Sequence, residues 1–171
     1  MRSPFAMNRR HFLAASTVLG VTSFGVYSTV RPKVAPESTF VLLDGTRRSS
    51  TDFKGRVTLV NFWATSCVSC VAEMPNLSST YSRYHDRGFD MIAVAMRYDP
   101  PSYVVNFANS RQLPFPVAID NTGEVARVWG DVALTPTTYL VDQRGRIVKH
   151  YVGEPDFVAL HALIEQLLAP A

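Results

Sequence analysis

The fold of this 171-residue chain is decided by the stretch Asn61-Phe-Trp-Ala-Thr-Ser-Cys67-Val-Ser-Cys70-Val-Ala-Glu73-Met-Pro75. Residues 57–62 are rich in β-branched and aromatic side chains, which predicts one buried strand. In residues 71–84 the larger apolar side chains recur at intervals of three and four, which predicts one face of a helix. They are Met74, Leu77, Tyr81 and Tyr84. Both cysteines of the chain therefore lie in a short turn between a strand and a helix.

The position of the two cysteines favours thiol chemistry. Cys67 is predicted just before the N-terminus of the helix, and Cys70 in its first turn. Unpaired N–H groups and the positive end of the helix dipole favour a thiolate, so we expect a lowered pKa for Cys67. Because only a thiolate attacks a disulfide, Cys67 suits the first step of exchange. Cys70 is better shielded and suits the second step, in which it attacks the mixed disulfide and releases the partner.

A zinc site and a structural disulfide each account less well for the cysteine pair. A zinc site needs two more cysteine or histidine ligands, and His85, His150 and His161 lack the paired spacing of such sites. A purely structural disulfide between Cys67 and Cys70 would close a very small loop and contribute little to stability. The spacing therefore predicts a redox-active dithiol.

The first thirty residues have the pattern of an export signal. Arg9 and Arg10 precede an uncharged stretch at residues 12–30, and the motif around them resembles the twin-arginine signature. A Sec-type signal with an unrelated arginine pair is the alternative. The stretch is long enough to span a bilayer, with the arginines left in the cytoplasm. We predict that residues 1–30 are a cleaved signal or a retained inner-membrane anchor. The remainder would lie in the periplasm or on the outer face of the cytoplasmic membrane, where a disulfide can persist.

The net charge of +3 comes from this N-terminal segment. Three of the 17 basic residues lie in the first thirty positions, and the remaining 14 equal the number of acidic residues. The sequence pI near 9.0 therefore does not indicate a nucleic-acid partner. A composition of 47% hydrophobic and 18% charged residues is that of a globular domain.

The rest of the chain predicts a linker and one α/β domain. Residues 31–38 contain two prolines and no periodicity, which is typical of a linker, and residues 39–169 form the domain. A hairpin at residues 40–50 precedes the strand that leads to the cysteines. Further strands are predicted at residues 89–96, 115–120, 138–141 and 146–152, and further helices begin at Asp99, at Asn121 or Thr122 as the cap, and at Pro155. This order predicts an α/β sheet with helices on both faces.

Three motifs together resemble a known family. They are Val60-Asn-Phe-Trp-Ala-Thr-x-Cys67-x-x-Cys70-x-x-Glu73-x-Pro75, Thr135-Pro136-Thr137-Thr138 and Asp142-x-x-Gly145. They resemble the TlpA/ResA-type disulfide reductases, thioredoxin-like proteins of the bacterial cell envelope that often serve cytochrome c maturation. The resemblance covers about residues 37–168. It implies a thioredoxin fold, with a central mixed sheet, helices on both faces and an extra N-terminal β-hairpin. It also implies exchange through a redox-active disulfide, with no cofactor.

The resemblance assigns roles to individual residues. Cys67 corresponds to the nucleophile and Cys70 to the resolving thiol, and the two can pair as a disulfide. Pro136 matches the cis-proline beside the dithiol, and Thr135 before it would face an incoming extended chain. Glu73 matches an acidic residue that could raise the pKa of the dithiol or accept its proton.

Two residues of the strand before the cysteines complete the candidate site. Asn61 stands where cytosolic thioredoxins carry a buried aspartate, so proton handling would fall to Glu73. Phe62 and Trp63 are typical of core and rim positions. Trp63 is also a candidate for the edge of the site, where it would contribute to substrate binding with Thr135 and Pro136.

Two departures from the family pattern leave the direction of electron flow open. Ser66 stands where tryptophan is usual, and Ser69 where proline is usual between the cysteines. Losing the proline adds an N–H donor near the Cys67 sulfur, which would stabilise the thiolate and make the pair more oxidising. The favoured function is reduction of disulfides in exported proteins such as apocytochrome c, with another envelope reductase restoring the dithiol. The alternatives are a disulfide oxidase or isomerase of the same fold, a copper-delivery module that binds Cu(I) through the thiolates, and a thiol peroxidase.

Overall fold

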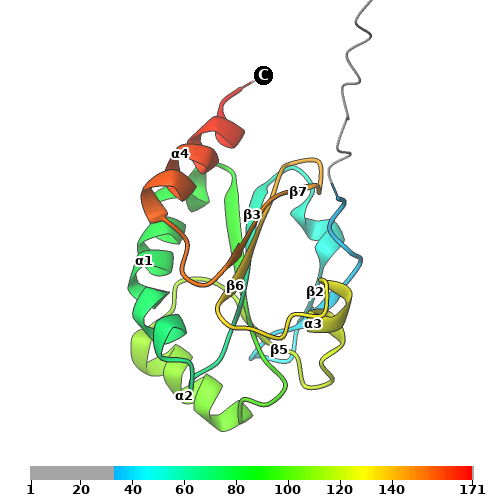
Figure 1. Ribbon diagram of the computed structural model, residues 1–171, viewed down its shortest axis with the longest axis vertical. Coiled ribbons are helices and arrows are strands. Elements are labelled where there is room, and N and C mark those ends of the chain that lie inside the picture. Colours follow the sequence, from blue (N-terminus) through cyan, green and yellow to red (C-terminus); the bar gives the residue numbers. More distant parts are fainter. Residues whose placement is uncertain (1–32, 171) are drawn as a thin grey trace, which may run out of the picture. The chain divides into compact units, whose positions relative to one another are not determined.

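A five-stranded mixed sheet forms the centre of the computed structural model, which describes residues 33–170 (Figure 1). Its strands lie in the order β5, β4, β3, β6, β7, with bounds Val117–Ile119, Phe89–Ala95, Val57–Trp63, Thr137–Val141 and Ile147–Val152. β3 pairs in parallel with β4, and β4 with β5, whereas β6 runs antiparallel to both of its neighbours. β3, which leads to the cysteines, is therefore the central strand.

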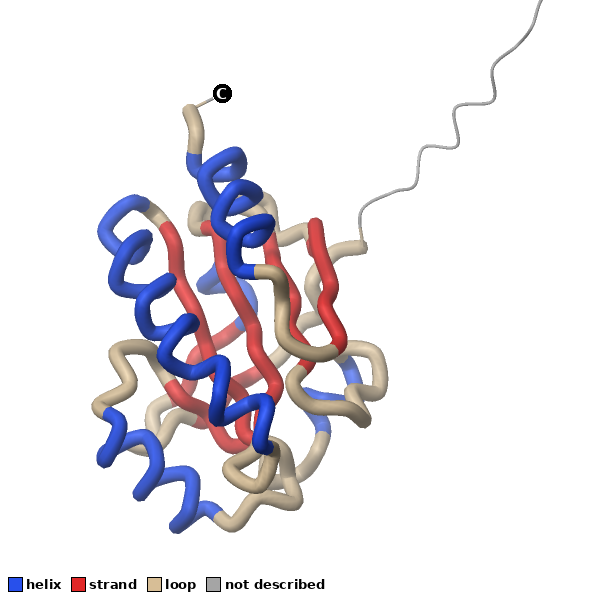
Figure 2. The backbone as a smooth tube through the Cα atoms, turned by 60° about the vertical axis from the view of Figure 1, so that its left-hand side comes forward, coloured by secondary structure: helices blue, strands red, loops and turns tan. Residues whose placement is uncertain are grey.

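Helices cover both faces of this sheet. They are α1 (Val68–Tyr84), α2 (Pro101–Arg111), α3 (Glu124–Val128) and α4 (Phe157–Leu168). α1, α2 and α4 contribute buried side chains to one core, and α3 contributes to the other. Figure 2 shows α1 and α4 lying across the same face of the sheet. On the opposite face α3 has only five residues, and the N-terminal hairpin packs on the same face.

The N-terminal hairpin completes the second core. It consists of β1 (Thr39–Val41) and β2 (Arg47–Ser49), followed by the 3-10 helix η1 (Ser50–Phe53), and a further 3-10 helix, η2 (His85–Arg87), follows α1. Phe40 and Phe53 are buried against Trp129 and the sheet. The predicted hairpin is thus present as a separate two-stranded sheet.

The two central strands are buried along their whole length. Their alternate side chains divide between the two cores, because Leu59 and Met91 belong to one and Val60 and Ile92 to the other. A strand covered on both faces is mostly apolar rather than alternating, and both segments have that pattern apart from Thr58, Asn61 and Asp90. The cysteines follow the carboxyl end of β3, the central strand.

The predicted order of strands and helices is confirmed, but one predicted helix cap is wrong. α3 begins after Gly123, whose φ is 76°, and not after Asn121 or Thr122. Asp120 Oδ2 accepts a hydrogen bond from Ala126 N at 2.8 Å, so a residue at the end of β5 satisfies a donor of this helix. The short turn before α3 is therefore held by the buried Asp120 carboxylate and by the Thr122 hydroxyl, which accepts Glu124 N at 3.2 Å, while Gly123 takes the cap position.

The predicted signal or anchor at residues 1–30 lies outside the described residues. None of the helices within residues 33–170 is long and apolar enough to cross a membrane. Part of the segment predicted as a linker bonds to the domain, since Ile147 N donates to Lys33 O at 2.7 Å and Ala35 N donates to Gly145 O at 2.9 Å. The chain therefore enters the domain beside the turn between β6 and β7.

Candidate active site

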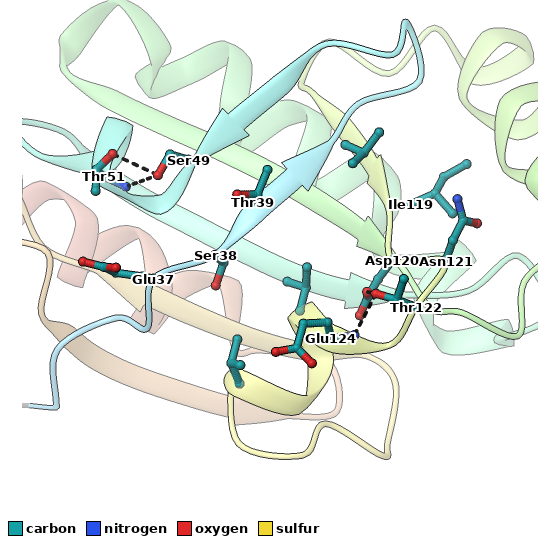
Figure 3. Close-up of a pocket in the computed structure, with 13 residues that line it drawn as sticks. Glu37, Ser38, Thr39, Ser49, Thr51, Ile119, Asp120, Asn121, Thr122 and Glu124 are labelled. Carbon is teal, nitrogen blue, oxygen red and sulfur yellow. Dashed lines mark hydrogen bonds between the residues drawn. The ribbon is translucent and has the colours of Figure 1, made fainter.

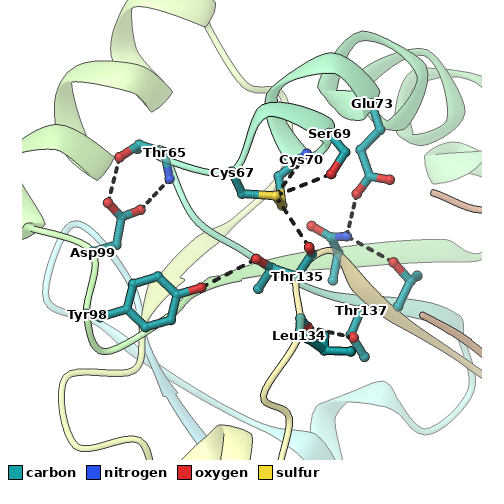
Figure 4. Close-up of a disulfide and its surroundings, with 12 residues drawn as sticks. Thr65, Cys67, Ser69, Cys70, Glu73, Tyr98, Asp99, Leu134, Thr135 and Thr137 are labelled. Carbon is teal, nitrogen blue, oxygen red and sulfur yellow. Dashed lines mark hydrogen bonds between the residues drawn. A yellow bond between two sulfur atoms is a disulfide. The ribbon is translucent and has the colours of Figure 1, made fainter. Parts of the chain in front are cut away.

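Cys67 is the N-cap residue of α1 and forms a disulfide with Cys70 (Figure 4). Its sulfur accepts a hydrogen bond from the Cys70 backbone N–H at 3.2 Å, in addition to facing the positive end of the helix. Cys67 is partly exposed, whereas Cys70 is fully buried. The predicted positions of both cysteines are confirmed, and only Cys67 presents its sulfur to a partner.

The loop before β6 lies against the disulfide. The Thr135–Pro136 peptide bond is cis, and the Thr135 carbonyl oxygen is 3.5 Å from the Cys67 sulfur. The Thr135 hydroxyl also contacts the Tyr98 hydroxyl at 3.4 Å, and Gly153 N donates to the Pro136 carbonyl at 2.8 Å. The structure thus brings Thr135 and Pro136 beside the cysteines. Thr135 and Cys67 are 68 positions apart in the sequence.

Glu73 lies one helical turn after Cys70 and is fully buried. Asn61 Nδ2 donates to Glu73 Oε1 at 2.9 Å and to Thr138 Oγ1 at the same distance. Glu73 Oε2 has no hydrogen-bond partner among the described residues. Burial raises the pKa of Glu73 to about 7. The hydrogen bond from Asn61 lowers this pKa, and the charge of Glu154 raises it by a smaller amount. A carboxyl group with this pKa can take up and release a proton near neutral pH.

Trp63 does not lie at the edge of the site. Its side chain is fully buried and packs against Phe107, with ring centroids 5.1 Å apart. It belongs to the core formed with α1 and α2. The substrate-binding position expected for Trp63 is therefore corrected to a core position, because alternation along β3 turns this side chain towards the helices.

Asp99 is a residue of the site that the sequence did not reveal. It follows β4, is only 3% exposed, and accepts hydrogen bonds from both the backbone N–H and the hydroxyl of Thr65, each at 2.6 Å. The carboxyl ends of parallel strands meet at one edge of a sheet, so a polar residue in the loop after β4 can lie near the residues that follow β3. Its position after a predicted strand is the one feature of the sequence that indicates a site role for Asp99. Asp99-Pro-Pro is equally typical of a helix start, so this feature does not single the residue out.

The disulfide reaches the surface through Cys67 alone, since Cys70 is fully buried. A cavity of about 580 Å³ is found between the hairpin and α3, and neither cysteine lines it (Figure 3). Within residues 33–170 there is also no cluster of three or more His, Cys, Asp or Glu residues that could hold a metal ion. A partly exposed sulfur beside a loop can be reached by another polypeptide chain, whereas small substrates are usually enclosed.

Residues 31–163 match the model of the Redoxin family. The chain belongs to the Redoxin family. It is similar to the thiol-disulfide oxidoreductase ResA of Bacillus thuringiensis, with 34% identity over 141 residues, which is 80% of each chain. ResA of Geobacillus thermodenitrificans is 36% identical over 140 residues, or 79% of each chain. The crystal structure of a thiol:disulfide interchange protein of the thioredoxin family from Chlorobium tepidum matches with a TM-score of 0.74 and 26% identity, covering 81% of this chain and 98% of that one.

These similarities confirm the resemblance found in the sequence. The fold is a thioredoxin fold, and the protein is a thiol-disulfide oxidoreductase whose cysteine pair is Cys67 and Cys70. Its substrates are thiols or disulfides of proteins. The roles of the individual site residues, the clients and the cellular location stay predictions.

Proposed function

We propose that this Redoxin-family protein reduces disulfides of exported proteins, apocytochrome c among them, by exchange at Cys67. The proposal is supported above all by the unequal exposure of the two cysteines, since Cys67 is partly exposed and Cys70 is fully buried. A protein partner can form a mixed disulfide only with a sulfur that it can reach. The order of the two steps follows from this difference.

In the first step the Cys67 thiolate attacks one sulfur of the client disulfide. A Cys67–client disulfide forms, and the other client sulfur leaves as a thiolate and takes a proton. Cys70 then loses its proton and attacks the Cys67 sulfur, which releases the second client thiol. Two electrons pass to the client, and the Cys67–Cys70 disulfide is left behind. A thiol reductant of the cell envelope must then return two electrons to restore the dithiol.

Glu73 is the proton acceptor for Cys70 in this scheme. The two residues are three apart on α1, a spacing that places side chains on the same helix face, and both are buried. The raised pKa of about 7 means that Glu73 is partly ionised at neutral pH. It can therefore accept the Cys70 thiol proton when the second step begins and release that proton later.

Ser69 supports a second candidate function, that of an oxidase or isomerase. The Ser69 hydroxyl lies 3.5 Å from the Cys67 sulfur, in addition to the backbone donor of Cys70. Donors near this sulfur stabilise the thiolate and so favour the dithiol form, which makes the disulfide a stronger oxidant. Equilibrating the protein with glutathione buffers distinguishes the two functions. A potential near −270 mV, as in thioredoxin, supports the reductase, whereas roughly −120 mV, as in DsbA, overturns it.

A trapping experiment tests the exchange role and identifies the client. In a Cys70→Ser variant the mixed disulfide cannot be resolved, so adducts on Cys67 should accumulate in cells and disappear on treatment with a reductant. The Cys67→Ser variant is the matched control and should give none. Apocytochrome c among the trapped proteins supports the proposed client. If cells that contain oxidised exported proteins yield no adduct specific to Cys67, the exchange role proposed here is wrong.

The proposed location outside the cytoplasm needs a separate test. Protease added to spheroplasts digests the protein only when it lies outside the cytoplasm, so digestion should depend on residues 1–30. Replacing Arg9 and Arg10 with lysine should abolish export if the signal is of the twin-arginine type. Normal export of this variant would indicate a Sec-type signal, and a natural chain that stays protected from the protease would contradict the location itself.

A further inference from the structure

The turn that carries Cys67 is held from one side by a single carboxylate. Residues 64–66 connect the end of β3 to the N-cap of α1. Asp99 Oδ2 accepts the backbone N–H of Thr65, and Asp99 Oδ1 accepts its hydroxyl, both at 2.6 Å (Figure 4). The turn closes on itself through the bond from Cys67 N to the Ala64 carbonyl at 3.1 Å. Asp99 therefore fixes the residue at the middle of the turn.

Asp99 is itself rigidly placed. Its backbone N–H donates to the Met96 carbonyl at 2.9 Å, and Met96 N donates to the Trp63 carbonyl at the end of β3. Pro100 and Pro101 follow, and their rings restrict the backbone at the start of α2. Because proline has no N–H, the two residues that directly follow Asp99 offer no backbone donor to its carboxylate. Both ends of the bridge between Asp99 and Thr65 are thus anchored to neighbouring central strands.

Burying the Asp99 carboxylate costs free energy, which its hydrogen bonds to the turn must offset. Asp99 is 3% exposed, and within residues 33–170 no arginine or lysine forms an ion pair with it. A buried charge without a counter-charge is unfavourable, and the two bonds from Thr65 are the hydrogen bonds that offset this cost. An apolar side chain after β4 would avoid the penalty, but it would leave the Thr65 backbone N–H without this partner.

We propose that Asp99 is a positioning residue of the redox site, which holds the Thr65 turn so that the Cys67 sulfur points to the Cys70 N–H. The effect arises from hydrogen-bond geometry. The charge of Asp99 alone would act the opposite way, since a negative charge disfavours a nearby thiolate. This inference requires only thiol–disulfide chemistry at Cys67, and it is independent of the client and the location proposed above.

The amide variant separates geometry from charge. In Asp99→Asn the side-chain oxygen can accept the Thr65 N–H, and the amide group can donate to the Thr65 hydroxyl oxygen, so both bonds persist without the charge. In Asp99→Ala both bonds are lost. Asp120→Ala is the matched control, because Asp120 is also 3% exposed, also follows a strand of the sheet, and also accepts a backbone N–H, in its case that of Ala126.

The experiment measures the alkylation rate of Cys67 against pH in a Cys70→Ser background, where Cys67 is the only thiol of the chain. Asp99→Ala should raise the pKa of Cys67 and slow alkylation at pH 7 by about three- to tenfold, the effect of weakening about one hydrogen bond to the thiolate. Asp99→Asn and Asp120→Ala should each stay within about twofold of the parent.

Three results would overturn the proposal. They are an unchanged Cys67 pKa in Asp99→Ala, an equal shift in Asp120→Ala, and an Asp99→Asn variant that behaves like Asp99→Ala. If Asp99→Ala does not fold, Thr65→Val decides the question, since it removes only the hydroxyl bond and keeps the backbone bond. It should shift the Cys67 pKa in the same direction by a smaller amount, and no shift would also overturn the proposal.

Discussion

Replacing Glu73 with glutamine in the oxidised protein tests whether this residue carries a proton near neutral pH. The pKa of Glu73 is raised by burial from 4.5 to about 7 in the folded protein. Below pH 4.5 the group is protonated in both states and contributes no pH dependence. Between pH 4.5 and 7 the folded state binds more protons than the unfolded state, so stability falls as the pH rises. Each unit corresponds to about 1.4 kcal/mol, so about 3 kcal/mol is lost across this window.

Urea unfolding of the oxidised protein at intervals from pH 4 to pH 8.5 measures this loss. The free energy of unfolding of Glu73→Gln should gain about 3 kcal/mol relative to the natural protein between pH 4.5 and 7, and the difference should then level off. The pH slope is the informative quantity, because a buried glutamine amide without acceptors costs about 1–3 kcal/mol at every pH. Glu124→Gln, at an exposed acid on α3, is the control and should leave the decline attributed to Glu73 in place.

Parallel stability curves for the natural protein and Glu73→Gln from pH 4.5 to 7.5 would refute this reasoning. Glu73 would then be ionised throughout this range, as a solvated acid is, and it could not accept the Cys70 proton at neutral pH. A carboxyl carbon titration by NMR gives the same answer independently, since it reports the ionisation of Glu73 directly.

Three further predictions concern burial and contacts at the site. In the reduced protein, Cys67 should be alkylated at least about tenfold faster than Cys70, because Cys67 is partly exposed and Cys70 is buried; mass spectrometry of partly labelled protein measures the ratio. Ser69→Pro should make the pair more reducing by about 10–30 mV, because a donor 3.5 Å from the Cys67 sulfur is lost; equilibration with dithiothreitol buffers checks this. Trp63→Ala should lower the free energy of unfolding by about 3–5 kcal/mol while Cys67 stays reactive in the folded fraction, since the ring fills the core.

The fold was largely predictable because its strongest signals are local. The apolar runs of β3 and β4 and the spacing of Met74 and Leu77 on α1 specify elements that need no distant partner to be recognised, and all are buried as expected. The turn with both cysteines was predictable for the same reason. Its position between a buried strand and an amphipathic helix follows from residues within about twenty positions.

The parts that were missed depend on contacts between distant segments. Asp99 bonds to Thr65, 34 positions earlier, and nothing within either segment shows that they meet. The cap of α3 was expected at Asn121 or Thr122, but Gly123 takes that position, and Asp120 supplies a carboxylate to the helix from the end of a strand. Position-by-position patterns identify elements, whereas side chains at the edge of a sheet acquire their partners only when the strands are aligned.

The two buried carboxylates near the cysteines differ in how their oxygens are satisfied, and this difference assigns them different tasks. Both oxygens of Asp99 accept a hydrogen bond from Thr65, whereas Glu73 receives one bond from Asn61 and keeps Oε2 without a partner among residues 33–170. A buried oxygen without a donor is stabilised by taking a proton, so Glu73 is suited to exchange protons. A carboxylate with both oxygens bonded to one turn is suited to hold that turn. Amide substitution should therefore preserve the function of Asp99 and abolish that of Glu73, although the chemical change is the same.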